Sequence, residues 1–356
     1  MPDGWQRVEP QSVQVADDIG ERLDRAVADG RIFGIHGVVV ARHGKIVLER
    51  YFAGEDSARG RKLGTVTFGP DTLHDLRSVS KSVVGLLYGI ALATGFVPPP
   101  EASLLDSFPD YADLRDDPAR RAWTVHHVLS MTMGTDWDEL SVPYTDPSNS
   151  EIAMDRAPDR YRYVLGLPVV LPPGIRFIYN GGATALLARM IARGSGQSLN
   201  DFARRALFDP LGIGNTEWLE DSRGEPFAAS GLRMRPRDLA RIGQLMLDGG
   251  GFEGREIVPA SWVSRCVTPV VDIDEMRRYG YQWYLGSHSY NVPEAPRWNR
   301  FRLARAWMAL GNGGQRLYLF PDLQLVIAVT AGNYDHAEQA IPPTRLSREV
   351  VLPSVR

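Results

Sequence analysis

The stretch "HDLRSVSKSVVGLLYGIAL", residues 74–92, sets three serines, Ser78, Ser80 and Ser82, around Lys81. Lys81 is one of only three lysines in the chain, whose basic charge is otherwise carried by arginine. Arginine cannot lose its proton near neutral pH, whereas a lysine can when its surroundings favour the neutral amine. The placement of Lys81 among serines therefore makes it a candidate base.

The spacing of this stretch indicates which serine the lysine serves. Residues three or four apart share one face of a helix, so Lys81 faces Ser78, while Ser80 and Ser82 point elsewhere. If Ser78 opens the helix, the positive end of the helix dipole favours negative charge at its oxygen, and a neutral Lys81 amine accepts its proton. A serine at a helix start is also a common N-cap, so the Ser-x-x-Lys motif alone leaves that structural role open.

The composition is that of a globular protein. The chain has 356 residues, 44% hydrophobic and 23% charged, with a formal net charge of −3, so we expect no nucleic-acid partner. The one cysteine, Cys266, excludes an internal disulfide and reads as a buried small residue. Without a signal peptide or an apolar run of about 18–20 residues, we expect a cytoplasmic protein with no membrane partner.

Strand patterns gather near both ends of the chain and helical patterns lie between them. The length allows two domains, and this order predicts an antiparallel sheet built from both ends with a helical insertion. The expected hairpins span 35–52 and 316–333, and further strands span 279–286 and 304–311. The expected helices span 15–30, 80–95, 124–134, 182–196, 198–212 and 235–250.

Several motifs in order resemble one family. "TVHHVLSMTMG" (124–134), "PPGIRFIYNGG" (172–182), "LFDPLGIGNTEW" (207–218) and "GNGGQRLYLFPDLQLVIAVTAGN" (311–333) follow the serine-lysine stretch. Together they resemble the serine β-lactamase-related hydrolases, which include class C β-lactamases, penicillin-binding DD-peptidases, family VIII esterases and 6-aminohexanoate-oligomer hydrolases. The resemblance runs over roughly residues 20–345.

The resemblance implies an α/β (α+β) fold of the β-lactamase/transpeptidase type. In this fold an antiparallel sheet is flanked by helices and an all-helical domain is inserted. We expect residues 12–75 and 261–356 to form the sheet domain and residues 76–260 the helical domain, with the active site between them.

The resemblance also implies roles for three residues. Ser78 is the nucleophile that forms an acyl-enzyme, and Lys81 is its partner. Tyr179 matches the tyrosine of the family's Y-x-N motif. With a lowered pKa next to Lys81, its phenol would act as base in acylation and as acid toward the leaving group. Which of Lys81 and Tyr179 takes the Ser78 proton stays open.

Two departures from the family pattern concern substrate binding. Gly181 stands at the asparagine position of Y-x-N, with Asn180 one residue earlier, so the amide that grips substrate is missing or displaced. The family's K-T-G or H-x-G motif has "GNGGQ" as its counterpart, with Asn312 at the position of the cation. The absence of that carboxylate-binding cation argues against an efficient β-lactamase or DD-peptidase.

The glycines after Asn312 suit a strand that substrate approaches closely. By family position, Gly313 and Gly314 would line the site, and the backbone N–H groups of Ser78 and Gln315 would bind the oxyanion. An ordinary glycine turn is the structural alternative.

Loop residues supply the remaining candidates. Trp137, Tyr144 and Asp146 fall where the family places loops over the cleft, although such aromatic residues are as often packing residues. Neighbouring His126 and His127 lack metal-ligand spacing. The other histidines (His36, His43, His74, His288 and His336) are isolated in the sequence, so we expect no metal site.

We therefore predict a serine hydrolase that cleaves an ester or amide bond of a small substrate through an acyl-serine, with no metal or organic cofactor. It would be a carboxylesterase or an amidase similar to the 6-aminohexanoate-dimer hydrolases. The enzymatic alternative is a β-lactamase or D-aminoacyl (DD-) peptidase that uses another cation, such as Arg316, for the substrate carboxylate. The non-enzymatic alternative is a catalytically silent penicillin-binding-like module. The sequence sets neither the natural substrate nor the oligomeric state.

Overall fold

The computed structural model describes residues 4–292, 296 and 300–356. Within these residues the main sheet has eight antiparallel strands in the order β10-β11-β12-β13-β14-β15-β1-β2. The two ends of the chain meet in it, because β1 pairs with β15. The strands are β1 Ile35–Arg42, β2 Lys45–Tyr51, β10 Val271–Asp272, β11 Arg278–Tyr279, β12 Tyr284–Asn291, β13 Phe301–Gly311, β14 Gln315–Phe320 and β15 Leu325–Ala331.

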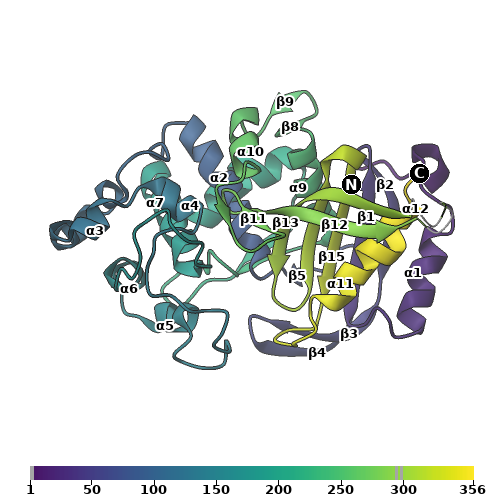
Figure 1. Cartoon of the computed structure of the whole chain (residues 1–356), viewed down its shortest axis with the longest axis horizontal. Helices are drawn as coiled ribbons and strands as arrows, with labels where there is room; N and C mark the ends of the chain where they lie inside the picture. Colours follow the sequence, from purple (N-terminus) through teal and green to yellow (C-terminus); the bar gives the residue numbers. More distant parts are fainter. Residues whose placement is uncertain (1–3, 293–295, 297–299) are drawn as a thin grey trace.

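The helices lie in two groups. In Figure 1, α3 to α7 gather at one end of the molecule, while α1, α11 and α12 lie beside the sheet at the other. The helices are α1 Ile19–Ala28, α2 Val79–Ala93, α3 Pro118–Arg121, α4 Val125–Leu129, α5 Ser150–Arg156, α6 Arg160–Gly166, α7 Gly181–Ser195, α8 Leu199–Ala203, α9 Pro236–Leu247, α10 Ala260–Cys266, α11 Ile341–Arg345 and α12 Leu352–Ser354.

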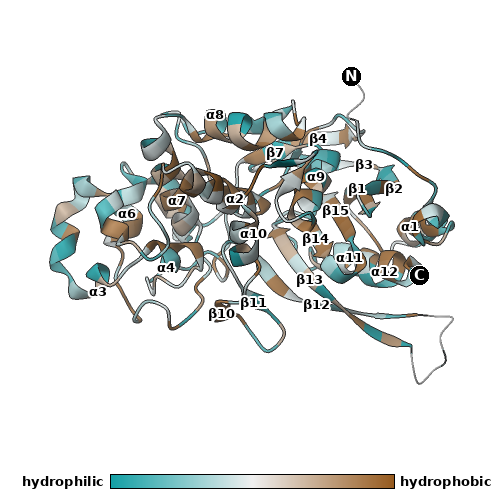
Figure 2. Cartoon of the chain, turned by 90° about the horizontal axis from the view of Figure 1, so that it is seen from above, coloured by the Kyte–Doolittle hydropathy of each residue, from teal (hydrophilic) through white to brown (hydrophobic). Residues whose placement is uncertain are grey.

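Strands β1, β14 and β15 are buried on both faces, which explains why β1 contains the continuous apolar run 38–41 rather than an alternating pattern. Successive side chains of a strand point to opposite faces. Val38 and Val40 belong to a core with α1 and the C-terminal helices, whereas Val39 and Ala41 belong to a second core with α2 and α9. Figure 2 shows hydrophobic residues concentrated along α2, α7 and β15 in the interior. The sheet is thus a central layer with helices on each side.

Smaller sheets complete the fold. One is a three-stranded sheet in the order β5-β7-β6, and its strand β5 lies directly before α2 in the chain, so this sheet fixes where that helix begins. The short strands are β3 Ala53–Ala58, β4 Arg61–Thr67, β5 His74–Asp75, β6 Thr216–Trp218, β7 Leu232–Met234, β8 Gly251–Phe252 and β9 Arg255–Glu256. No helix among the described residues combines the length and the apolar character that a bilayer crossing requires.

The expected architecture is confirmed, with an antiparallel sheet built from both ends of the chain and helices between. Two expected elements are broken at or near a residue with a positive φ. The helix expected at 124–134 ends at Leu129, and Met131 follows it with a positive φ of 57°. The strand expected at 279–286 is interrupted, because Gln282 has a φ of 63°.

The expected division into a sheet domain and a helical domain at 76–260 stays a prediction. Helices α4 to α7 do lie apart from the sheet in Figure 1. However, α9 falls inside 76–260 and packs on β1, β14 and β15 of the sheet.

Candidate active site

Ser78 stands at the start of α2, on a turn that the preceding residues hold in a strained shape. Arg77 adopts a φ of 48°, which is uncommon for a residue with a side chain. Asp75 holds it there: one carboxylate oxygen accepts from the Arg77 backbone N–H at 3.1 Å, and the other lies 3.2 Å from the Arg77 Nε. The Ser78 hydroxyl makes no helix-capping hydrogen bond, so the structural alternative of an N-cap does not apply.

Lys81 is buried on the same helix, one turn beyond Ser78, as the spacing predicts. Its Nζ lies 3.0 Å from the Ser78 Oγ and 3.2 Å from the backbone oxygen of Ala229. It also lies 3.6 Å from a carboxylate oxygen of Glu139 and 4.7 Å from the centre of the Tyr179 ring. The structure therefore brings together the three residues for which the resemblance implied catalytic roles.

Tyr179 precedes α7, and its side chain is buried and hydrogen-bonded to Ser78. Burial raises the pKa of the Tyr179 phenol well above its ordinary value, and the nearby Glu139 carboxylate adds to this rise. The hydrogen bond with Ser78 opposes it but is weaker. The expectation of a lowered pKa for Tyr179 is therefore wrong, because desolvation and the nearby carboxylates outweigh the hydrogen bond with Ser78.

Glu139 is a buried acid at the centre of the site that the sequence analysis missed. One of its oxygens accepts hydrogen bonds from the Trp137 Nε1 at 2.7 Å and from the Gly181 backbone N–H at 2.6 Å. The other oxygen faces Lys81. Burial raises the pKa of Glu139 to about 7, although Lys81 pulls it down. Its charge thus changes near neutral pH.

A second buried acid, Glu151 at the start of α5, was also missed. The Ser230 hydroxyl donates to it at 2.7 Å, and the Arg59 guanidinium lies at 3.7 Å. Burial raises its pKa, but Lys81, Arg59 and Ser230 together outweigh burial, and the pKa of Glu151 lies below its ordinary value. Lys81 therefore lies in the field of two carboxylates, Glu139 and Glu151. Both come from the segment between α4 and α6, which has no motif or periodicity to mark them.

The departure at Gly181 has a structural explanation. A Cβ added at Gly181 would lie 3.0 Å from a Glu139 oxygen and 3.5 Å from the carboxyl carbon of Glu151. The two acids thus border the space that a side chain at this position would enter. Asn180 does not replace the missing amide, because its oxygen caps α7 by accepting from the Ala183 N–H at 2.9 Å.

A cavity of about 370 Å³ opens at Ser78. Its walls include two further tyrosines, Tyr144 and Tyr284, and the exposed Leu140. The end of β13 supplies the opposite wall; the residues that line it there and nearby are Leu310, Gly311, Asn312, Arg316, Asp335 and Gln339. Ser78 and Tyr144 also line an adjoining cavity of about 160 Å³, so the site has two compartments.

The "GNGGQ" segment contributes less to the cavity than expected. Asn312 lines it, but Gly313, Gly314 and Gln315 do not. Gln315 is fully buried and paired with Gly311 in the β13–β14 ladder. Its side-chain amide accepts from the Ala331 N–H, away from the cavity. The Gln315 side chain therefore lies away from the cavity, and the role expected for its backbone N–H in binding the oxyanion stays a prediction.

The three loop candidates occupy different positions. Tyr144 lines both compartments, as expected of a loop over the cleft. Trp137 is buried and binds Glu139 instead of lining the cavity. Asp146 is exposed and accepts from the Ser148 N–H in its own loop. Trp137 is thus a packing residue that orients an acid, while Asp146 is a surface residue.

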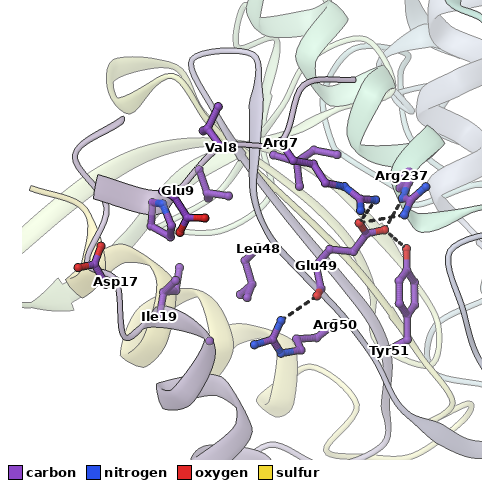
Figure 3. A pocket seen from close by; sticks show the side chains of 14 residues that line it. Arg7, Val8, Glu9, Asp17, Ile19, Leu48, Glu49, Arg50, Tyr51 and Arg237 are labelled. Carbon is purple, nitrogen blue, oxygen red and sulfur yellow. Dashed lines mark hydrogen bonds and ion pairs between the residues drawn. The ribbon is translucent and has the colours of Figure 1, made fainter. Parts of the chain in front are cut away.

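A larger cavity, of about 470 Å³, lies away from the serine, between the N-terminal segment and β2 (Figure 3). Glu49 lies at one side of it, where Arg7, Arg237 and Tyr51 all bind its carboxylate. Because these charges pair with each other, the size of this cavity gives it no chemistry comparable to that at Ser78.

The histidines differ in one respect from their isolated appearance in the sequence. His36 and His74 lie together, with 2.9 Å between the Nδ1 of one and the Nε2 of the other. His126 binds the Tyr281 hydroxyl at 2.7 Å, and His127 accepts from the Thr124 N–H, so both have structural partners. His36 and His74 are thus isolated in the sequence but neighbours in the fold, although β1 and β5 belong to different sheets.

Comparison with known proteins places this geometry in a family. The family described as Beta-lactamase matches residues 19–348. The chain is 28% identical over 259 residues to the 6-aminohexanoate-dimer hydrolase of Paenarthrobacter ureafaciens, which covers 69% of this chain and 58% of that protein. It is 26% identical over 155 residues to the lovastatin esterase of Penicillium rubens, which covers 42% of this chain and 37% of that protein.

The chain thus spans between about a third and three fifths of the length of these two curated relatives. Among solved structures it is similar to EstCE1, described as a hydrolase with promiscuous acyltransferase activity. The TM-score is 0.70 at 15% identity, and the match covers 92% of this chain and 98% of that one. The match over residues 19–348 shows that the chain belongs to the Beta-lactamase family, a family of serine hydrolases.

Proposed function

We propose that the protein hydrolyses an ester or amide bond of a small substrate through an acyl intermediate on Ser78. The observation that carries the proposal is the contact of the Ser78 hydroxyl with both Lys81 and Tyr179 at the mouth of the 370 Å³ cavity. The relatives named as a dimer hydrolase and a lovastatin esterase support this reaction class.

Proton transfer follows from the partners of Lys81. The Ala229 carbonyl can only accept, and so can an ionised Glu139 carboxylate. A neutral Lys81 amine has two N–H bonds to direct at these acceptors and one lone pair left for the hydroxyl proton of Ser78. Lys81 is therefore the base in acylation in this proposal. Tyr179 keeps its own proton because its pKa is raised.

The reaction then proceeds by addition and elimination. As Lys81 takes the proton, the Ser78 oxygen attacks the carbonyl carbon, and the backbone N–H groups of Ser78 and Asn312 bind the developing oxyanion. We assign the second donor to Asn312 rather than to Gln315 because Asn312 lines the cavity and Gln315 does not. The carbon–leaving-group bond breaks as Tyr179 donates its proton to the departing oxygen or nitrogen, and Lys81 returns a proton to Tyr179. Water releases the acyl group by the same steps in reverse.

The experiment is intact-mass analysis and product release with a series of p-nitrophenyl esters and matching p-nitroanilides. Ser78→Ala is compared with Ser82→Ala, because Ser82 lies in the same motif but donates to the Gln282 backbone oxygen. We expect one acyl adduct on Ser78 in the wild type and in Ser82→Ala, and neither adduct nor turnover in Ser78→Ala. Turnover that survives Ser78→Ala would refute the mechanism, and no adduct or turnover in the wild type would favour a silent binding module.

One observation favours a second candidate, a peptidase or β-lactamase for substrates with a carboxylate. Arg316 lines the same cavity, although its Nη1 donates to the backbone oxygens of Gly311 and Gln315. A chromogenic cephalosporin separates the two candidates. Rapid hydrolysis that Arg316→Gln reduces far more than it reduces ester hydrolysis would favour this second function.

A further inference from the structure

Three buried side chains from separate strands meet outside the catalytic cavity. They are His36 of β1, Asp56 of β3 and His74 of β5. Their candidate ligand atoms all lie within 4.8 Å of one another, and among the described residues this is the one such group of histidine, cysteine and acidic side chains. The His74 Nε2 lies 2.9 Å from the His36 Nδ1 and 3.6 Å from an Asp56 oxygen.

The lone pairs that meet at this cluster outnumber the protons that could lie between them. The His74 Nδ1 faces the Asp75 backbone oxygen at 3.0 Å, and since a carbonyl only accepts, this nitrogen carries the proton. The His74 Nε2 then presents a lone pair toward His36 and Asp56. A proton on the His36 Nδ1 can be donated to the His74 Nε2, which satisfies the contact between the two histidines. The contact between the His74 lone pair and the Asp56 carboxylate still lacks a positive charge.

Neighbouring groups fix the orientation of these three side chains in the way that is usual for metal ligands. A hydrogen bond from the outer nitrogen of a histidine to a carbonyl fixes the tautomer in many metal sites. Here the outer contact of His74 is with Asp75, and the Tyr334 hydroxyl donates to Asp56 at 3.0 Å. The His36 ring stacks on Phe68 at 4.2 Å, so its orientation is also fixed.

Two glycines leave room for the His36 ring. A Cβ at Gly54 would lie 2.5 Å from the His36 Nε2, and a Cβ at Gly332 would lie 2.4 Å from its Cε1. The backbone of β3 and the end of β15 thus close around this imidazole.

We propose that His36, Asp56 and His74 bind one divalent transition-metal ion such as zinc. Two imidazole nitrogens and one carboxylate oxygen are a ligand set that suits zinc and cobalt. The ion would supply the missing positive charge and join three elements, β1, the β3–β4 hairpin and β5. Because His74 lies four residues before Ser78, the ion would stabilise the turn that carries the nucleophile rather than take part in the reaction.

The test measures metal directly, independent of any substrate. The full chain without an affinity tag is expressed with added zinc, because a buried site fills during folding, and metal content is measured after gel filtration. We expect about one zinc per chain in the wild type and less than about a tenth of that in His74→Gln and Asp56→Asn. His43→Asn is the matched control, because His43 is an exposed histidine in a turn with a positive φ that asparagine also adopts.

A second readout guards against misfolding of the variants. Wild-type protein expressed with cobalt should show the visible absorption of a nitrogen- and oxygen-ligated ion. A chelator should lower the melting temperature of the wild type and of His43→Asn, but not that of the site variants. Wild-type protein with no bound metal and a melting temperature indifferent to chelator would overturn the proposal. So would equal zinc content in the wild type and His74→Gln. The cluster would then be a hydrogen-bonded pair beside an acid.

Discussion

Replacing Glu139 with glutamine tests whether a buried acid controls the protonation of the catalytic base. The amide keeps the shape of the side chain and an oxygen for the hydrogen bonds from Trp137 and Gly181. What it removes is the negative charge 3.6 Å from the Lys81 Nζ. An ionised Glu139 favours the protonated form of its neighbour, so its removal should move the acidic limb of the activity profile to lower pH.

The size of the effect follows from the separation of the charges. Two unit charges 3.6 Å apart interact by about 5 kcal/mol at an effective dielectric constant of about 20. At ~1.4 kcal/mol for each pH unit, this corresponds to an upper limit of roughly 3 units. Glu151 remains in place, and the pKa of Glu139 of about 7 leaves it only partly ionised in neutral solution. We therefore expect a shift of about 1–2 units.

The assay is the rate of Ser78 labelling by an organophosphonate ester, followed by intact mass from about pH 5 to about pH 9. Labelling needs the activated serine but no knowledge of the natural substrate. Glu217→Gln is the control, because it removes an acid that pairs with Arg233 at the surface. An acidic limb that stays at the wild-type position in folded Glu139→Gln protein would refute the reasoning, as would an equal shift in Glu217→Gln.

Three further predictions concern stability, each measured by urea unfolding. Asn180→Ala removes the cap of α7 and should cost about 1 kcal/mol; an unchanged midpoint would contradict this role. The pKa of Glu139 is raised from 4.5 to about 7 on folding, so its contribution to stability is present at low pH and is lost as the pH rises through 7. Glu139→Gln should therefore gain stability relative to the wild type between about pH 5 and about pH 8, and a relative loss would contradict the raised pKa. Gly89→Ala places a Cβ 2.0 Å from the Trp262 ring and should cost about 1–3 kcal/mol, whereas Gly166→Ala meets open space and should cost nothing.

The fold was predictable because its main signals are local. The hairpin at 35–52 has the residues of a tight turn at His43 and Gly44, and both adopt the positive φ that such a turn needs. The apolar runs of β14 and β15 indicate strands buried on both faces, and both strands are fully buried. Where a residue broke the local pattern, as Gln282 does with its positive φ, the periodicity gave no warning.

The site was predictable only where its residues lie in one motif. Ser78 and Lys81 share a helix turn, so their contact follows from spacing, and Tyr179 was located through the family resemblance. Glu139 reaches Lys81 only through the packing of a loop that lacks regular structure. His36 and His74 are 38 residues apart in the sequence and meet because their strands belong to neighbouring sheets.

Gly181 stands at the asparagine position of the Y-x-N motif, and an acid nearby provides a polar partner for Lys81. Gly181 has no side chain, yet its backbone N–H holds the Glu139 carboxylate, and that carboxylate faces Lys81. The Cβ of an asparagine at 181 would lie 3.0 Å from an oxygen of Glu139, so the carboxylate would have to shift slightly to admit it. A neutral amide that can donate to substrate is thus replaced by an acid that can only accept when ionised. In this chain Glu139 therefore supplies a polar contact to Lys81 beside the position where the family motif has an asparagine.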